Sequence, residues 1–318
     1  MAKTNVKSTK KTVKKAPAST PTAEPKSDSE SLEVAESNDS SEMVEGLREE
    51  ADAELQEAFD ESQVSDQDNS IAIVIPYKEE SAAGTELLYA IRAWEKFFPK
   101  GKIVIIGDKP SSLNDNIVHI PHTPISDNPQ VDVAQKLMMA IESDLVSDFF
   151  IVSNDDIYPV SPLSLTQIDL LVSGGPFVPR GNAGGVFREN SERTIEALKE
   201  AQIKTPMDYS THTPVTYWKE ELKEILLKYG CLENGFLIST LYNNIVWQGS
   251  RPVVVDNGAN PGHAGTRSYV GSAFKKVNPD NMRDAFENRI FINNDDRGWA
   301  SVLPFLQKLF PEKSSFEK

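Results

Sequence analysis

Three short runs of apolar residues constrain the fold of this chain more than any other feature of its sequence. They lie within residues 71–75, 102–108 and 148–153, and the first is five consecutive apolar residues. A continuous run, rather than an alternation of apolar and polar residues, is typical of a strand that is covered on both faces, as in a parallel sheet. The runs therefore predict buried strands at the centre of an α/β fold.

Amphipathic segments between these runs predict helices. In residues 85–99 apolar side chains recur on one helical face until Pro99 ends the segment, and residues 130–145 repeat this pattern. A short apolar stretch at 116–121 predicts a further strand between the two. Strands that alternate with helices indicate a mostly parallel sheet with flanking helices. The second half of the chain predicts helices at 190–202, 219–230, 233–247 and 299–311, a strand at 251–256 and a glycine-rich loop at 257–271.

The first 68 residues differ in composition from the rest of the chain. Residues 1–26 contain seven lysines and one glutamate, and residues 27–68 contain sixteen acidic residues and one arginine, in a chain whose net charge is -15. Both segments are poor in large apolar residues, so they bury too little surface to offset the entropy that ordering would remove. We expect a disordered, charged tail over 1–68 and one folded domain over 69–318.

The sequence also bears on the compartment and on the partners of the protein. It has no apolar run of about 18 residues that would predict a membrane span. Its single cysteine, Cys231, precludes an intrachain disulfide and suits a reducing compartment. We therefore expect a cytoplasmic protein in which Cys231 is buried. The basic segment 1–26 leaves contact with nucleic acid open, although we favour a solubilising tether.

Polar residues follow three of the predicted strands. Tyr77 follows the first strand, Asp108 the second, and the sequence Asn154, Asp155, Asp156 the fourth. Ligands of α/β sheets bind beyond the carboxyl ends of the strands. Since parallel strands end at one edge of their sheet, these residues predict a binding site at that edge.

The adjacent carboxylates of Asp155 and Asp156 are suited to a hard divalent cation. Mg²⁺ and Mn²⁺ bind oxygen ligands, typically one or two carboxylates together with the oxygens of a diphosphate. The alternative is a structural turn, because asparagine and aspartate favour turns. A second acidic pair, Asp295 and Asp296, follows Asn294. It either approaches the same ion or caps the last helix.

Histidine is scarce in this chain, which makes each one informative. His212 lies in "DYSTHTPVTYW", a segment with hydroxyl residues and a proline that we expect to be a loop. It is a candidate general base, metal ligand or phosphate donor, and we favour it over His263. Arg92 lies on the first helix, where its position by itself predicts a solvated face. No Walker loop and no G-x-G-x-x-G fingerprint follows the first strand, which disfavours nucleotide hydrolysis and dinucleotide chemistry.

Four segments in the same order resemble those of known transferases. The layout is similar to that of GT-A type glycosyltransferases, and in particular to the Stealth-type capsular polysaccharide phosphotransferases and related phage and gut-bacterial glycosyltransferases. "ELLYAIRAWEKFFP" resembles their "NELRYSLRSIEKY" segment, "DFFIVSNDDIYPVSP" their "FLYLNDDFFF" segment, "YSTHTPVTYWKE" their histidine-proline segment, and "FINND" their closing "IND" segment. The opening "IPYKEES" departs from the Stealth pattern of a strand followed by tryptophan and an asparagine–glycine pair.

The resemblance implies a GT-A-like fold over residues 69–318 and a divalent ion. It also implies site residues, namely Glu86, Arg92, Asp155, Asp156, His212, Asn294 and Asp295.

We interpret the chain as a metal-dependent glycosyltransferase that uses Mn²⁺ or Mg²⁺ and a nucleotide-diphospho-sugar donor. The donor would lie across the strand ends, against Tyr77, Asp108 and Asn154, with Lys136 and Arg92 offsetting phosphate charge. The acceptor would be a glycan or another hydroxyl compound. Two alternatives remain, a Stealth-type transfer of sugar phosphate and a non-catalytic binding or assembly module on a transferase fold.

Overall fold

The computed structural model describes residues 71–178, 185–254, 268–271, 290–294 and 298–318. All of them belong to one compact unit, Gln67–Lys318. The tail predicted over residues 1–68 lies outside the described residues, as do His263 and Asp295. None of the described helices combines the length and the apolar character that crossing a bilayer requires.

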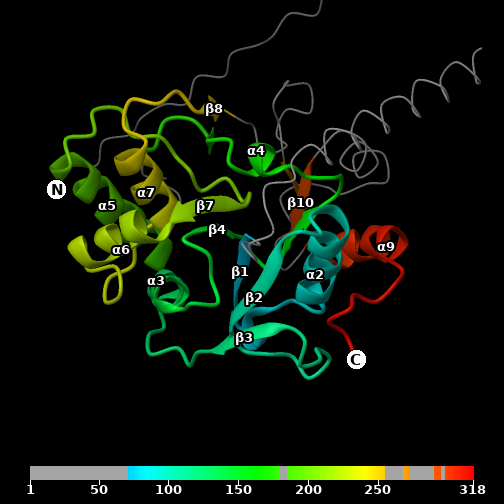
Figure 1. Cartoon of the computed structure of the whole chain (residues 1–318). Coiled ribbons are helices and arrows are strands. Elements are labelled where there is room, and N and C mark those ends of the chain that lie inside the picture. Colours follow the sequence, from blue (N-terminus) through cyan, green and yellow to red (C-terminus); the bar gives the residue numbers. More distant parts are fainter. Residues whose placement is uncertain (1–70, 179–184, 255–267, 272–289, 295–297) are drawn as a thin grey trace, which may run out of the picture. The chain divides into compact units, whose positions relative to one another are not determined.

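A five-stranded sheet forms the centre of this unit (Figure 1). Its strands stand in the order β3–β2–β1–β4–β7, and every neighbouring pair is parallel except β4 with β7. This mostly parallel sheet with flanking helices confirms the predicted α/β fold. The strands are β1 (Ala72–Tyr77), β2 (Lys102–Gly107), β3 (Val118–Pro121), β4 (Phe149–Val152) and β7 (Val215–Trp218).

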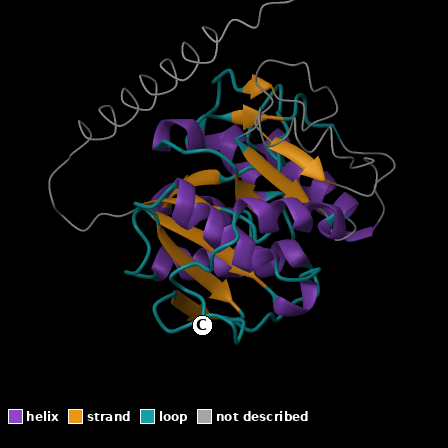
Figure 2. Ribbon diagram, turned by 90° about the vertical axis from the view of Figure 1, so that its right-hand side faces the viewer, coloured by secondary structure: helices purple, strands orange, loops and turns teal. Residues whose placement is uncertain are grey.

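The middle strand, β1, is buried on both faces. Ile73 packs in the same cluster as residues of α2 (Glu86–Phe97), whereas Val74 packs in the cluster that includes residues of α3 (Pro129–Glu142). Figure 1 shows α2 on one side of the sheet and α3 on the other. In Figure 2, which looks onto the side that carries α2, helices lie in front of the strands. This double cover explains why the sequence of β1 is continuously apolar.

Capping signals in the sequence define the start of α3. The side chain of Asn128 accepts a hydrogen bond from the Gln130 backbone N–H at 3.0 Å, and Pro129 occupies the first turn. The helix ends at Glu142, earlier than its apolar pattern predicts, because Ser143 adopts an extended backbone. Leu145 therefore lies exposed in the connection to β4.

Two smaller sheets and further helices surround the central sheet. β5, β10 and β9 form one of these sheets, and β6 pairs with β8 in the other. These elements are η1 (Glu79–Ser81), β5 (Ile157–Pro159), α4 (Leu165–Ile168), β6 (Val172–Ser173), α5 (Gly185–Glu200), α6 (Lys219–Lys228), α7 (Ile238–Val246), β8 (Val253–Val254), β9 (Ser268–Gly271), β10 (Phe291–Asn294) and α9 (Trp299–Leu309).

Two strands lie where the sequence predicted loops. β9 falls within the glycine-rich stretch 257–271 and pairs in parallel with β10. β7 follows His212 closely and pairs antiparallel with β4. Both predictions were wrong for the same reason. Each strand is short, and it forms because the edge of a distant strand supplies partners for its backbone groups.

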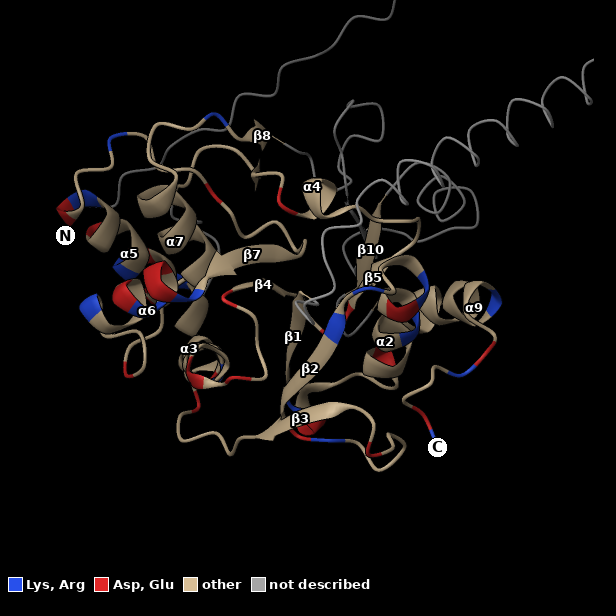
Figure 3. Ribbon diagram, viewed as in Figure 1, with Lys and Arg blue, Asp and Glu red and all other residues tan. Residues whose placement is uncertain are grey.

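The helices α6 and α7 pack on the side of the sheet that carries α3. Leu222 on α6 and Leu241 on α7 belong to the same apolar cluster as the inward side chains of α3. Figure 3 shows acidic and basic residues together on α6. Between the two helices, Cys231 is fully buried, as predicted, and burial raises the pKa of its thiol to about 12.

An ion pair fastens the C-terminal segment to α2. The Arg92 guanidinium donates from Nε to Glu317 Oε1 at 2.7 Å, from Nη2 to Glu317 Oε2 at 2.6 Å and from Nη1 to the Phe310 carbonyl at 3.1 Å. Both side chains are largely buried. Burial by itself would raise the pKa of Glu317, but hydrogen bonds from Arg92 and Ser314 outweigh it, and that pKa lies below its ordinary value.

Replacing Arg92 with methionine should lower the free energy of unfolding by about 3 kcal/mol, because the Glu317 carboxylate then stays buried without its partner. Urea unfolding followed by tryptophan fluorescence measures the loss. The exposed pair of Arg188 and Glu192 offers a matched control, since Arg188→Met should leave the free energy of unfolding nearly unchanged. Equal losses in the two variants would contradict a structural role for the buried pair.

The same ion pair also predicts a dependence on pH. The pKa of Glu317 is lower in the folded than in the unfolded protein, so its contribution to stability is present above the ordinary pKa of 4.5 and is lost as the pH falls below it. The difference in unfolding free energy between the wild type and Arg92→Met should therefore narrow in acid. A difference that stays constant from neutral to acid pH would show that Glu317 is not the group concerned.

Candidate functional site

The carboxyl ends of β1, β2 and β4 lie at one edge of the central sheet. Since β1 runs parallel to both neighbours, Tyr77, Asp108 and Asn154 all lie at strand ends on this edge. The backbone N–H of Asp108 donates to the Tyr77 carbonyl at 3.3 Å, and its Oδ2 accepts from the Glu79 backbone N–H at 2.8 Å. The structure thus brings together the three polar strand ends that the sequence indicated.

The direction in which strands are added to the sheet reverses between β1 and β4. β2 and β3 lie on one side of β1, and α3 then leads the chain to β4 on the other side. In open α/β sheets such a reversal leaves a crevice at the carboxyl edge, between the ends of the two strands. Here the ends of the two strands are Tyr77 and the turn at residues 154–156.

Carboxylates surround two tyrosines at this edge. Burial raises the pKa of Tyr77 to about 12, and nearby carboxylates, Asp155 first among them, add to the shift. Burial also raises the pKa of Tyr158 well above its ordinary value, with further contributions from carboxylates that include Glu86. The potential at both hydroxyls is therefore negative, which favours a bound cation. The carboxylates that act on one or both tyrosines are Glu79, Glu86, Asp108, Asp155 and Asp156.

Glu86 and Asn294, which the resemblance implied as site residues, are bonded to each other. Asn294 Nδ2 donates to Glu86 Oε1 at 2.6 Å, and Glu86 Oε2 accepts from the Ala83 backbone N–H at 2.7 Å. The Tyr158 hydroxyl donates to Asn294 Oδ1 at 2.8 Å. This buried chain joins the start of α2 to β10 and β5. Tyr158 was not predicted as a site residue, although it stands two residues after Asp156.

Lys136 lies beneath the edge rather than at its surface, with its side chain 2% exposed. Its Nζ donates to Asp132 Oδ2 at 2.7 Å and to the Tyr77 carbonyl at 2.9 Å. Asp132 Oδ1 in turn lies 3.1 Å from His122 Nε2. The ammonium group that we expected to offset phosphate charge is instead held by protein atoms, and it anchors the end of β1. Neither Asp132 nor His122 was predicted from the sequence to be a partner of Lys136.

A glycine makes this close approach of lysine to the strand end feasible. Gly107 ends β2 with φ at 128°, a backbone conformation that other residues rarely adopt. A Cβ atom at this position would lie 1.9 Å from the Tyr77 carbonyl oxygen and 3.1 Å from Lys136 Cε. Any side chain here would therefore displace the contact between Lys136 and Tyr77.

His212 lies in the loop before β7 and is exposed. Its backbone has a positive φ of 48°, which is uncommon outside glycine, and its carbonyl accepts a hydrogen bond from Asn293 Nδ2 at 2.7 Å. His212 and Asn154 line the same cavity, of about 250 Å³. The structure thus brings the predicted histidine into one cavity with the turn that carries the acidic pair.

Arg92 does not join this group within the described residues. Its guanidinium is bonded to Glu317 and to the Phe310 carbonyl, and it lies further along α2 than Glu86. These contacts give Arg92 a role in stabilising the fold, and we do not assign it to the binding of phosphate.

The described residues offer a divalent cation two adjacent carboxylates. Both Asp155 and Asp156 are partly exposed in the turn after β4. No group of three histidine, cysteine or acidic side chains suited to a metal ion occurs in the described part of the chain, and Asp295 lies outside it. Mg²⁺ binds commonly through one or two carboxylates with phosphate and water oxygens. The residues present therefore fit an ion that a diphosphate brings with it.

Comparison with known proteins finds similarity to solved structures alone. No protein-family model matches the sequence, and no curated protein matches it either. A crystal structure of the galactosyltransferase LgtC, in complex with donor and acceptor sugar analogues, shares 12% identity over 78% of this chain and 98% of its own, with a TM-score of 0.40. A glycosyltransferase involved in glycosylation of the major capsid of PBCV-1 shares 10% identity over 70% of this chain and 92% of its own, with a TM-score of 0.36. The bifunctional glycosyltransferase WbbM shares 12% identity over 79% of this chain and 53% of its own, with a TM-score of 0.40.

These similarities carry no conclusion about activity. The resemblance to Stealth-type proteins stays a prediction.

Replacing Lys136 with methionine should lower the free energy of unfolding by about 3 kcal/mol, because the Asp132 carboxylate is left buried without its cation. The double variant Lys136→Met, Asp132→Asn should recover part of this loss, since it carries no uncompensated charge. Urea unfolding measures both. The exposed Lys199, paired with Glu196, is the control, and Lys199→Met should be nearly neutral. A double variant less stable than Lys136→Met would refute the charge argument.

Proposed function

We propose that this protein is a glycosyltransferase that moves a sugar from a nucleotide-diphospho-sugar to a hydroxyl group of an acceptor. The observation that carries the proposal is the position of Asp155 and Asp156 directly after β4, where the strand order of the sheet reverses. A crevice at strand ends suits a nucleotide, and an acidic pair suits the divalent cation that accompanies a diphosphate.

The donor would lie across the ends of β1, β2 and β4. Tyr77 and Asn154 bound the crevice, and Asp108 lies beside Tyr77, where a carboxylate can accept hydrogen bonds from ribose hydroxyls. The contacts of Lys136 with the Tyr77 carbonyl and with Asp132 keep the floor of this site in place before the donor arrives. Such a preformed floor lowers the entropy lost on binding.

Asp155 and Asp156 would hold Mn²⁺ or Mg²⁺, which supplies neutralisation of the charge that develops on the leaving diphosphate. A further carboxylate at this edge, Glu86, accepts a hydrogen bond from Asn294. Tyr158 keeps its proton, because burial and the neighbouring charges raise its pKa, and it uses that proton to orient Asn294. Two of the groups near the acidic pair, Glu86 and Tyr158, are thereby held by hydrogen bonds to Asn294.

His212 would accept the proton of the acceptor hydroxyl. It is exposed and shares a cavity with Asn154, so an acceptor in this cavity lies next to the acidic turn. Its positive φ has an energetic cost that the hydrogen bond from Asn293 helps to offset. Backbone strain of this kind is concentrated at functional sites, which supports His212 as part of the site.

A panel of nucleoside diphosphates, tested with and without Mn²⁺, provides the main test of the proposal. One nucleotide should raise the melting temperature of the full chain only when Mn²⁺ is present, by an amount equivalent to about 2.7 kcal/mol at a hundredfold excess over its Kd. The variant Asp155→Asn, Asp156→Asn should lose this response. Glu196→Gln, an exposed acid on α5, should keep it. No shift with any nucleotide would favour a binding module and would leave the acidic pair as a turn.

Replacing His212 with glycine should separate stability from activity. Glycine adopts a positive φ without strain, so unfolding should become about 1 kcal/mol more costly, while transfer from the donor identified above falls by about a hundredfold or more. Chemical unfolding and product formation measure the two effects. His212→Asn is the matched variant, because asparagine tolerates this conformation but is no base. Full activity in either variant would remove His212 from the mechanism.

A further inference from the structure

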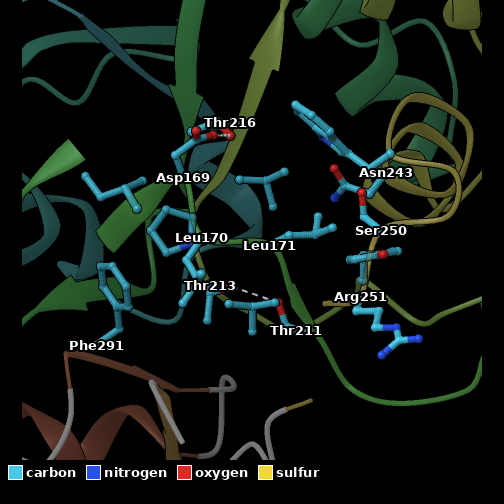
Figure 4. A pocket seen from close by; sticks show the side chains of 16 residues that line it. Asp169, Leu170, Leu171, Thr211, Thr213, Thr216, Asn243, Ser250, Arg251 and Phe291 are labelled. Atoms are coloured by element: carbon cyan, nitrogen blue, oxygen red, sulfur yellow. Dashed lines mark hydrogen bonds between the residues drawn. The ribbon is translucent and has the colours of Figure 1, made fainter. Parts of the chain in front are cut away.

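A second cavity lies beside the one that contains His212. It measures about 280 Å³ and lies between the 168–172 segment, β7 and the end of α7 (Figure 4). Tyr209, Thr211 and Thr213 line both cavities. The loop that carries His212 is therefore a wall shared by the two, with His212 lining only the first.

One polar side chain in this second cavity is buried but forms no bond. Asn243 on α7 is 5% exposed, and its amide makes no hydrogen bond to any residue in the described part of the chain. Figure 4 shows Asn243 on the same side of the cavity as Ser250 and Arg251. This amide is therefore a donor and acceptor that a ligand in the cavity would satisfy.

The other walls combine charge with apolar surface. Asp169 accepts a hydrogen bond from the Thr216 hydroxyl at 2.7 Å and is exposed, so its carboxylate accepts further bonds. Arg251 forms no ion pair with a described residue and contributes donors from an exposed position. One acid and one base give this cavity little net charge, which favours an uncharged ligand over a phosphate or a carboxylate.

An exposed tryptophan supplies a flat apolar surface at the same place. Trp247 follows α7, lines the cavity and is 42% exposed. A third cavity, of about 680 Å³, shares Tyr209, Trp247, Ser250 and Arg251 with the second. The two cavities thus form one groove that continues away from His212, and its size is in the range of ligand sites. Lys204 also lines the third cavity but not the second, so the part of the groove beside Asn243 keeps its balance of one acid and one base.

We propose that this groove binds an uncharged saccharide as the acceptor. Saccharides present hydroxyls that donate and accept at once, which matches the amide of Asn243, the carboxylate of Asp169 and the guanidinium of Arg251. They also present apolar C–H faces, which match Trp247. Thr211 and Thr213 line both cavities, so the end of the saccharide that receives the new sugar would extend along them into the cavity that His212 lines. The role of this saccharide as the acceptor rests on the proposed function. The saccharide site itself follows from the residues that line the groove.

Saturation-transfer NMR on the full chain tests the site without any donor. The probes are methyl glycosides of glucose, galactose, mannose and N-acetylglucosamine and their disaccharides, with glucuronic acid and glucose 6-phosphate as charged comparisons. At least one neutral probe should bind in the millimolar range or tighter, and a disaccharide should bind more tightly than its monomer. Asn243→Ala and Trp247→Ala should each weaken binding by about tenfold or more.

Two controls separate this site from the donor site and from a general loss of folding. Trp218→Ala removes a tryptophan of similar exposure, 45%, that does not line the groove, and it should leave saccharide binding unchanged. The variant Asp155→Asn, Asp156→Asn should also retain saccharide binding while it loses the response to nucleotide and Mn²⁺. Thermal melts of the Asn243 and Trp247 variants confirm that each is folded.

The outcomes for the two proposals are distinguishable. If a neutral saccharide binds and both groove variants, Asn243→Ala and Trp247→Ala, weaken its binding, the result supports the proposed saccharide site. This holds whether or not any nucleotide binds. Absence of binding, binding only of the charged probes, or binding that the groove variants leave unchanged would overturn it, even if the nucleotide test succeeds.

Discussion

β1 lies between β2 and β4 and has helices on both faces, so only its ends approach solvent. A strand enclosed in this way cannot carry polar side chains along its length, because each would be buried without a partner. Polar function is therefore confined to the carboxyl end, at Tyr77. The buried ammonium of Lys136 fixes this end through the Tyr77 carbonyl, and Gly107 leaves the room that the contact needs.

The same edge accumulates negative charge, and the structure limits the repulsion in several ways. Asp132 is paired with Lys136, Glu86 is bonded to Asn294, and the Tyr158 hydroxyl stays protonated. The pair at residues 155–156 remains partly exposed beside these groups. A cation would lower the energy of this arrangement further, which is the physical basis of the proposed donor site.

The loop from Tyr209 to Val215 connects the donor edge to the groove proposed for the acceptor. It lines both cavities, and it holds His212 in a strained conformation beside Asn154. A sugar transferase needs its two substrates to meet at one point, since productive reaction requires the reacting atoms to be in close contact. The two cavities lie on either side of this loop, so the acceptor would have to extend past Thr211 and Thr213 into the cavity that His212 and Asn154 line.

The sequence by itself determined the α/β class, the buried strands and the strand-end polar residues, because burial and helix formation leave periodic patterns in neighbouring residues. Only the tertiary structure decided the partners. Arg92 and Glu317 are 225 positions apart, and Glu86 and Asn294 are 208 apart, so no local pattern marks either bond. β7, β9 and the groove beside Trp247 likewise arise where distant segments meet. Long-range contacts such as these depend on how the whole chain packs, and the local sequence carries no record of them.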